Sequence, residues 1–207
     1  MGKTVTCPKC RHTQTVFLPD SANVSSQPEI KAKIMMNEFF KVKCARCGHE
    51  TPVAFDFIYH DTTNRIMIYL LPTYTEKYAD SLDKVGNAML SNSPDYTLRI
   101  VKSPNELIEK VKIFDAGRDD RFIEILKILL LLDFAQARPD FRIKHIFFDS
   151  RKGEDAFVMF NEGGEMISEK FSEETYANIA NTYSMSGKLG KTHAFLVIDR
   201  NWALSLL

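Results

Sequence analysis

Hydrophobic and polar residues alternate in the first third of the chain, which is the pattern of β-strands. The alternation is clearest over residues 53–59 and 65–71, where aromatic or aliphatic side chains stand at every second position. A period of two predicts strands with one buried face. The polar segment 60–64 lies between these runs and predicts a hairpin turn. Shorter runs at 14–18 and 40–43 predict two further strands.

A polar insertion separates the first two predicted strands. Residues 19–27 are rich in Ser and Asn and predict a mobile loop. Pro28 follows, and proline suits the first turn of a helix, so we expect a short helix through about Met36.

The middle of the chain has the signals of two helices. Ser103 and Pro104 resemble a capped helix start, and Gly117 ends that helix. A strongly apolar helix then runs to about Ala137 and stops before Pro139. Its apolar core is too short to span a bilayer, so we expect a buried helix.

The last third of the chain returns to strand-like sequence. Residues 143–148 and 156–160 predict strands, residues 173–183 a helix, and residues 194–198 a final strand. Together these elements predict a small α/β layer.

All four cysteines occur in two C-x-x-C pairs, Cys7 with Cys10 and Cys44 with Cys47. Two intervening residues let one tight turn direct two thiolates at the same ion, and tetrahedral zinc takes four of them at about 2.3 Å. The sequence therefore predicts one structural Zn²⁺ ion held by these four residues. Four thiolates leave no open coordination position, so we expect the ion to support folding rather than catalysis.

The surroundings of the two pairs favour a metal over its alternatives. Gly48 suits the left-handed backbone that often follows such a turn, whereas Arg11 stands there in the first pair. The 33 residues between the pairs exceed the usual spacing, and the loop–helix insertion explains the excess. Disulfides are disfavoured in a cytosolic setting, and strand-like sequence follows each pair where a redox motif would start a helix. His12 and His49 are possible substitute ligands that four thiolates make unnecessary.

The first 72 residues resemble the CpXC family, a prokaryotic group named for paired Cys-Pro-x-Cys turns. Pro8 keeps the proline in the first turn, and Ala45 replaces it in the second. The further similar segments are residues 57–61, 66–69, 105–110 and 119–121. The resemblance implies a zinc-ribbon-like domain, and it implies no reaction because the family has no established activity.

We therefore predict an α+β fold with three parts. An N-terminal zinc ribbon, antiparallel with a loop–helix insertion, spans residues 1–75. A helical segment follows over residues 76–138, and a C-terminal α/β segment packed with the helices spans residues 139–207.

Charge and composition exclude some partners. The chain has 27 basic and 27 acidic residues, a formal net charge of +0, which argues against a protein built mainly to hold duplex phosphates. The chain lacks an apolar leader after Met1 and a membrane-length apolar run, so we expect a cytoplasmic protein that binds no membrane.

Nucleic acid remains an alternative partner. Basic residues near the cysteines could form a modest positive face, and aromatic rings nearby could stack on bases. The residues concerned are Lys3, Lys9, Arg11, Lys41, Lys43 and Arg46 with Phe39, Phe40 and His49.

Other motifs offer weaker chemistry. His60 beside Asp61 is the best catalytic candidate, but neighbours in a strand point to opposite faces. Residues 187–192 are similar to a phosphate-binding loop but lack its first glycine, where Met185 stands, and precede a predicted strand. Asp119, Asp120, Glu124 and Asp133 could suggest a cluster for a hard cation. Asp119 and Asp120 are better explained as helix-start charges, and Glu124 as the polar stripe of a buried helix.

The sequence thus favours a non-enzymatic binding or scaffold module with a protein partner and an undetermined oligomeric state. A nucleic-acid-associated ribbon, an enzyme using the His60 region and a thiol sensor using the cysteines are the alternatives.

Overall fold

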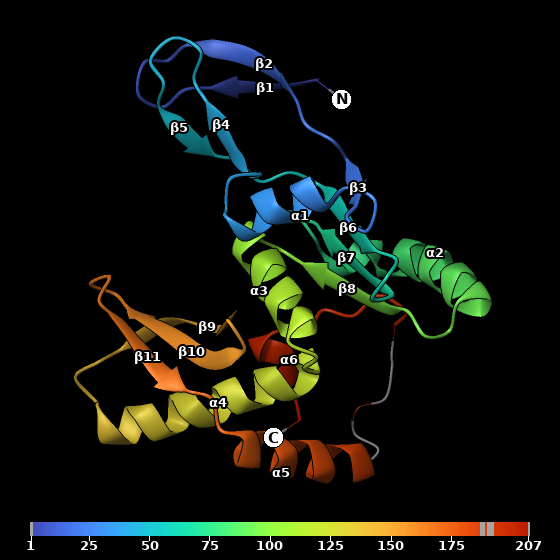
Figure 1. Cartoon of the computed structure of the whole chain (residues 1–207), viewed down its shortest axis with the longest axis vertical. Helices are drawn as coiled ribbons and strands as arrows, with labels where there is room; N and C mark the ends of the chain where they lie inside the picture. Colours follow the sequence, from blue (N-terminus) through green and yellow to red (C-terminus); the bar gives the residue numbers. More distant parts are fainter. Residues whose placement is uncertain (1, 187–188, 190–192, 207) are drawn as a thin grey trace. The chain divides into compact units, whose positions relative to one another are not determined.

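The computed structural model describes residues 2–186, 189 and 193–206 (Figure 1). The chain forms two compact units: Met1–Ile108 with His193–Leu196, and Glu109–Thr192 with Val197–Leu207. Each unit combines helices with antiparallel or mixed strands, which confirms the α+β class. The proposed division at residues 75 and 138 stays a prediction. None of the described helices is long and apolar enough to cross a membrane.

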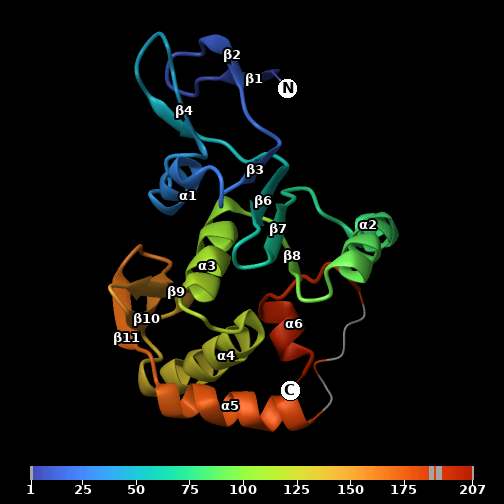
Figure 2. The ribbon, with the colours of Figure 1, turned by 45° about the vertical axis from the view of Figure 1, so that its right-hand side comes forward.

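Two small hairpins and a four-stranded sheet build the first unit. The hairpins are β1 (Gly2–Thr6) with β2 (Thr13–Phe17), and β4 (Lys41–Lys43) with β5 (Glu50–Pro52). They lie side by side at one end of the unit (Figures 1 and 2). The sheet has the order β3-β6-β7-β8, formed by β3 (Ser21–Asn23), β6 (Phe57–Asp61), β7 (Ile66–Leu70) and β8 (Thr97–Val101).

The alternating runs form the predicted central hairpin. Strands β6 and β7 pair antiparallel with Tyr59 opposite Ile68, and both strands show the same burial pattern, with every second residue buried. The predicted insertion helix is α1 (Pro28–Met35), which starts at Pro28 as expected. The predicted loop before it contains the short strand β3, which pairs parallel with β6.

Several elements of the first unit were not individually predicted. A 3-10 helix η1 (Glu76–Tyr78) and helix α2 (Ala79–Asn92) follow the central hairpin. Strand β8 interrupts the segment predicted as helical and pairs parallel with β7. Arg99 interrupts the apolar run of β8, so the hydrophobic pattern does not predict this strand. In the folded chain Arg99 is nevertheless buried, with an exposed fraction of 6%.

The second unit packs helices on a three-stranded sheet. Its sheet has the order β11-β10-β9, formed by β9 (Ile143–Arg151), β10 (Glu154–Asn161) and β11 (Met166–Lys170). The helices are α4 (Asp120–Ala137), α5 (Glu173–Met185) and α6 (Arg200–Leu204), with the last part of α3 (Pro104–Asp115). Helix α4 contacts both α5 and α6 (Figure 2). Phe148 and Phe157 from the sheet join its buried core.

The predicted final strand over residues 194–198 is wrong. Leu196 forms only an isolated parallel bridge to Arg99, in the first unit. Asp199 then caps helix α6 by accepting a hydrogen bond from the Trp202 backbone N–H, so the chain turns helical where the strand was expected to end. The segment that is similar to a phosphate-binding loop lies outside the described residues, except for Leu189.

Candidate metal centre

The four cysteines lie together at the tips of the two hairpins. Their sulfur atoms all lie within 4.8 Å of one another. Cys7 Sγ is 3.6 Å from Cys47 Sγ, and Cys10 Sγ is 3.6 Å from Cys44 Sγ. These separations far exceed a disulfide bond of about 2.05 Å, and all four cysteines are free. Among the described residues this is the one group of three or more ligand-type side chains close enough to hold a metal ion.

The sulfur geometry fits a tetrahedral ion. A regular tetrahedron with metal–sulfur distances of about 2.3 Å has edges of about 3.8 Å. Two sulfur pairs, each at 3.6 Å, join one hairpin to the other. Small movements of the cysteine side chains would bring all four sulfur atoms to this spacing, so the cluster could hold one metal ion.

The two cysteine turns share the same backbone hydrogen bonds. In the first, Cys7 N–H donates to the His12 carbonyl and Arg11 N–H donates to the Cys7 carbonyl, both at 2.9 Å. In the second, Cys44 N–H donates to His49 and Gly48 N–H donates to Cys44, again at 2.9 Å. The turns thus repeat one structure, which explains how each supplies half of the sulfur cluster.

Gln14 connects the two hairpins. Its side-chain amide donates to the Lys43 carbonyl at 3.0 Å and accepts from the Ala45 backbone N–H at 2.8 Å. Both contacts lie beside the second cysteine turn, so this side chain fixes one turn against the other. The sequence does not reveal this role, because the two partners are about thirty residues away in the chain.

The thiols differ in acidity. The Cys47 backbone N–H donates to the sulfur of Cys44 and lowers the pKa of Cys44 to about 7. The His12 backbone lowers the pKa of Cys10, but burial and the three other sulfurs outweigh it and raise that pKa to about 12. Without a cation, the negative charge of one thiolate disfavours ionisation of the neighbouring thiols. A divalent ion would offset this repulsion.

An aromatic cluster supports the base of the hairpins. Phe39, Phe40, Phe55 and Phe57 pack with ring centroids 4.9–6.3 Å apart. Lys3 of β1 lies over the Phe55 ring, 4.6 Å from its centroid. Phe40 is 2% exposed and so cannot stack on a base, contrary to the nucleic-acid expectation for that residue.

His60 and Asp61 have different partners. His60 Nε2 lies 3.0 Å from the Tyr96 hydroxyl, and burial lowers the pKa of His60 despite the opposing charge of Asp61. Asp61 is buried and accepts hydrogen bonds from the Asn64 backbone and side chain at 3.0 and 2.9 Å. Ser25 also donates to Asp61. These contacts give Asp61 a role in holding the β6–β7 turn.

Three acids at the start of the apolar helix have partners within the second unit. Asp119 caps α4 by accepting from the Arg121 N–H at 2.9 Å, as predicted. Asp120 and Glu124 are buried, and Lys110 Nζ lies 3.0 and 3.3 Å from them. The expected polar stripe at Glu124 is therefore wrong, because the carboxylate pairs inside the core.

This buried chain of charges extends to Glu109. Lys127 Nζ lies 3.0 Å from Glu109 and 3.1 Å from Glu124, and Glu109 accepts from the Phe148 backbone N–H at 2.6 Å. Burial raises the pKa of Glu109, although Lys127 opposes this. Burial alone lowers the pKa of Lys127, but Glu109 and Glu124 raise it overall. Lys110 and Lys127 therefore supply the positive charge that pairs with these buried carboxylates.

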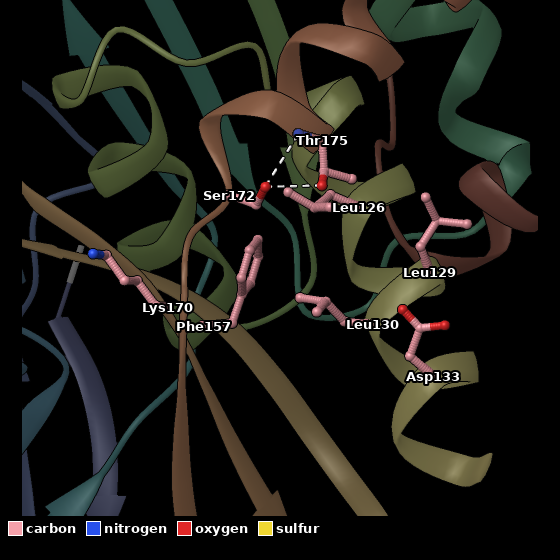
Figure 3. A pocket seen from close by; sticks show the side chains of 8 residues that line it. All are labelled: Leu126, Leu129, Leu130, Asp133, Phe157, Lys170, Ser172 and Thr175. Carbon is pink, nitrogen blue, oxygen red and sulfur yellow. Dashed lines mark hydrogen bonds between the residues drawn. The ribbon is translucent and has the colours of Figure 1, made fainter. Parts of the chain in front are cut away.

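A pocket of about 200 Å³ lies in the second unit (Figure 3). Leu126, Leu130 and Phe157 line it with apolar surface. The Ser172 and Thr175 hydroxyls at its edge lie 2.8 Å apart, and Ser172 caps α5 by accepting from the Thr175 N–H. Both hydroxyls support the start of α5, and Asp133 and Lys170 are the charged residues that line the pocket.

The fold and the site define an α+β protein with four clustered cysteines that could hold a metal ion. The chain belongs to the CpXC family: the family model, described as CpXC protein, matches residues 5–127, more than half of the chain. No curated protein and no solved structure matches it.

Proposed function

We propose that the cysteine cluster binds one structural Zn²⁺ ion and that the two hairpins then form a zinc ribbon. The ribbon is part of a cytoplasmic, non-enzymatic binding module. The observation that carries the proposal is the sulfur geometry, with pairs at 3.6 Å across the two hairpins. Zinc is the ion that four thiolates in tetrahedral arrangement bind most commonly in structural sites.

The hairpins need such an ion for stability. Each has only two strands of three or five residues, and an isolated two-stranded hairpin is marginally stable at best. Binding energy from a structural zinc ion then becomes folding energy. Four thiolates also fill the coordination shell, which leaves no position for a substrate or an activated water.

Hydrogen exchange of the full-length protein tests this function. Removal of zinc with a chelator under reducing conditions should expose the backbone amides of residues 2–18 and 41–52 to rapid exchange. Strands β9 to β11 serve as the internal control and should keep their protection. Cys47→Ser should behave like the chelated protein, and Thr15→Ala, a change on the exposed face of β2, should behave like the wild type. Unchanged protection of the hairpins after zinc removal would contradict the proposal.

A further inference from the structure

Positive charge is concentrated on the two hairpins. Residues 2–18 and 41–52, called the ribbon from here on, contain six basic residues and one acidic residue, a formal net charge of +5. The basic residues are Lys3, Lys9, Arg11, Lys41, Lys43 and Arg46, and the acidic residue is Glu50. Because the whole chain has a net charge of +0, the remainder carries −5.

The metal site reduces this charge without cancelling it. One Zn²⁺ ion with four thiolates contributes −2, so the loaded ribbon keeps a charge of about +3. Five of the cations are exposed: Lys9, Arg11, Lys41, Lys43 and Arg46. No ion pair joins any of these five to an acid in the part of the chain that the structure describes. Their charge is therefore available to a partner.

The cations follow the ribbon from its base to its tip. Lys41 and Lys43 stand two residues apart on the exposed face of β4, which places them about 7 Å from each other along the strand. Lys9 and Arg46 occupy the same position in the two cysteine turns, directly before the second cysteine. A linear polyanion can contact such an extended series of charges at several points.

The exposed face of the first hairpin, opposite to the face from which Gln14 contacts the second hairpin, offers further groups that suit nucleic acid. Thr4, Thr6, Thr13 and Thr15 are exposed on one face of β1 and β2. Phe17 lies on the same face and is 86% exposed. Threonine hydroxyls contact phosphates, and exposed aromatic rings stack on unpaired bases.

We propose that the zinc-loaded ribbon binds the sugar–phosphate backbone of single-stranded nucleic acid without sequence preference. The inference rests on the proposed function, since zinc would hold the ribbon together. An acidic peptide would use the cations but not the exposed aromatic ring. A membrane surface requires a broad apolar face, which a single Phe17 does not supply.

Fluorescence anisotropy with a labelled oligothymidylate and an oligouridylate tests the proposal on the zinc-loaded, full-length protein. With five phosphate contacts, the affinity should fall about 100-fold between 50 and 200 mM salt. Replacement of Lys9, Lys41, Lys43 and Arg46 by glutamine should weaken binding at 50 mM salt at least 100-fold and flatten the salt dependence. The matched control replaces Lys33, Lys77, Lys84 and Lys144, which are exposed outside the ribbon, by glutamine. These changes should leave the affinity and its salt dependence unchanged. A duplex of the same length should bind more weakly.

Zinc content, measured on the same samples, separates this inference from the proposed function. A zinc-loaded wild type that does not bind the oligonucleotides overturns the inference alone. Equal binding by the ribbon variant and the control variant also overturns it, as does equal or tighter binding to polyglutamate or to phosphatidylserine vesicles. A chain that carries no zinc overturns both claims.

Discussion

Arg11 and Gly48 adopt the same left-handed backbone at equivalent places in the two cysteine turns, with φ angles of 58° and 70°. Each residue follows the second cysteine of its pair and donates its N–H to the carbonyl of the first cysteine. The backbone therefore imposes the same conformation on a glycine and on an arginine. For residues with a side chain, this conformation costs about 1–2 kcal/mol.

Substitutions at these two positions should have opposite effects on stability. Gly48→Ala should lower the free energy of unfolding by about 1 kcal/mol, because an added Cβ meets only the Lys43 side chain at 3.8 Å and the backbone strain remains. Arg11→Gly should be neutral or stabilising by up to about 1 kcal/mol, because it removes the same strain. Denaturant unfolding of the zinc-loaded variants measures both. Equal destabilisation by the two changes would contradict the equivalence of the turns.

Asp61 should stabilise the first unit in a pH-dependent way. Burial raises the pKa of Asp61, but hydrogen bonds from Asn64, the charge of Lys31 and a hydrogen bond from Ser25 together lower it below its ordinary value of 3.8. A lowered pKa means that this stabilisation is complete above the ordinary value and is lost as pH falls from there through the lowered pKa of the folded state. Asp61→Asn should therefore cost about 1–3 kcal/mol near pH 6 and progressively less below pH 4.

His60→Gln provides the neighbouring control. The His60 side chain is half-buried, and Tyr96 is its one hydrogen-bond partner among the described residues, so we expect a cost below about 1 kcal/mol. Any loss of metal at acid pH should affect the wild type and both variants alike, so the differences between them should isolate the carboxylate. A constant Asp61→Asn difference from pH 6 to pH 3 would refute this account of Asp61.

The buried lysine of α4 should be essential to the second unit. Lys127→Met leaves Glu109 and Glu124 without their shared cation, and removing one partner of a buried pair costs about 3–5 kcal/mol. Adding Glu109→Gln to this variant should restore part of the loss. Arg138→Gln removes an exposed pair with Asp140 at 3.7 Å and should cost less than about 1 kcal/mol. Thermal unfolding compares the three variants, and a similar cost for Lys127→Met and Arg138→Gln would argue against a buried network.

The sequence predicts those elements whose signals are local. The hairpin of β6 and β7 follows from alternation along each strand, and α4 follows from its capping acid and the proline beyond its end. The cysteine cluster follows from spacing alone. Strand β8 lacks such a signal, since Arg99 interrupts it and its burial depends on the parallel neighbour β7.

Tertiary relationships could not be predicted in this way. Glu124 occupies a polar position on an apolar helix, and only the folded chain shows that Lys110 and Lys127 enclose it. Gln14 looks like an ordinary strand residue until its contacts with the second hairpin are seen. The positive face of the ribbon could be predicted from the sequence as a possibility, but only the folded chain shows that five of its six basic residues are exposed.

Metal stoichiometry by native mass spectrometry tests the central claim most directly. The full-length protein, purified without added metal, should carry one zinc ion per chain. Cys44→Ser should abolish or greatly reduce zinc occupancy, and the exposed substitution Thr15→Ala should leave it intact. A wild-type chain with no zinc, or a Cys44→Ser chain with full zinc occupancy, would contradict a structural zinc site formed by the four cysteines.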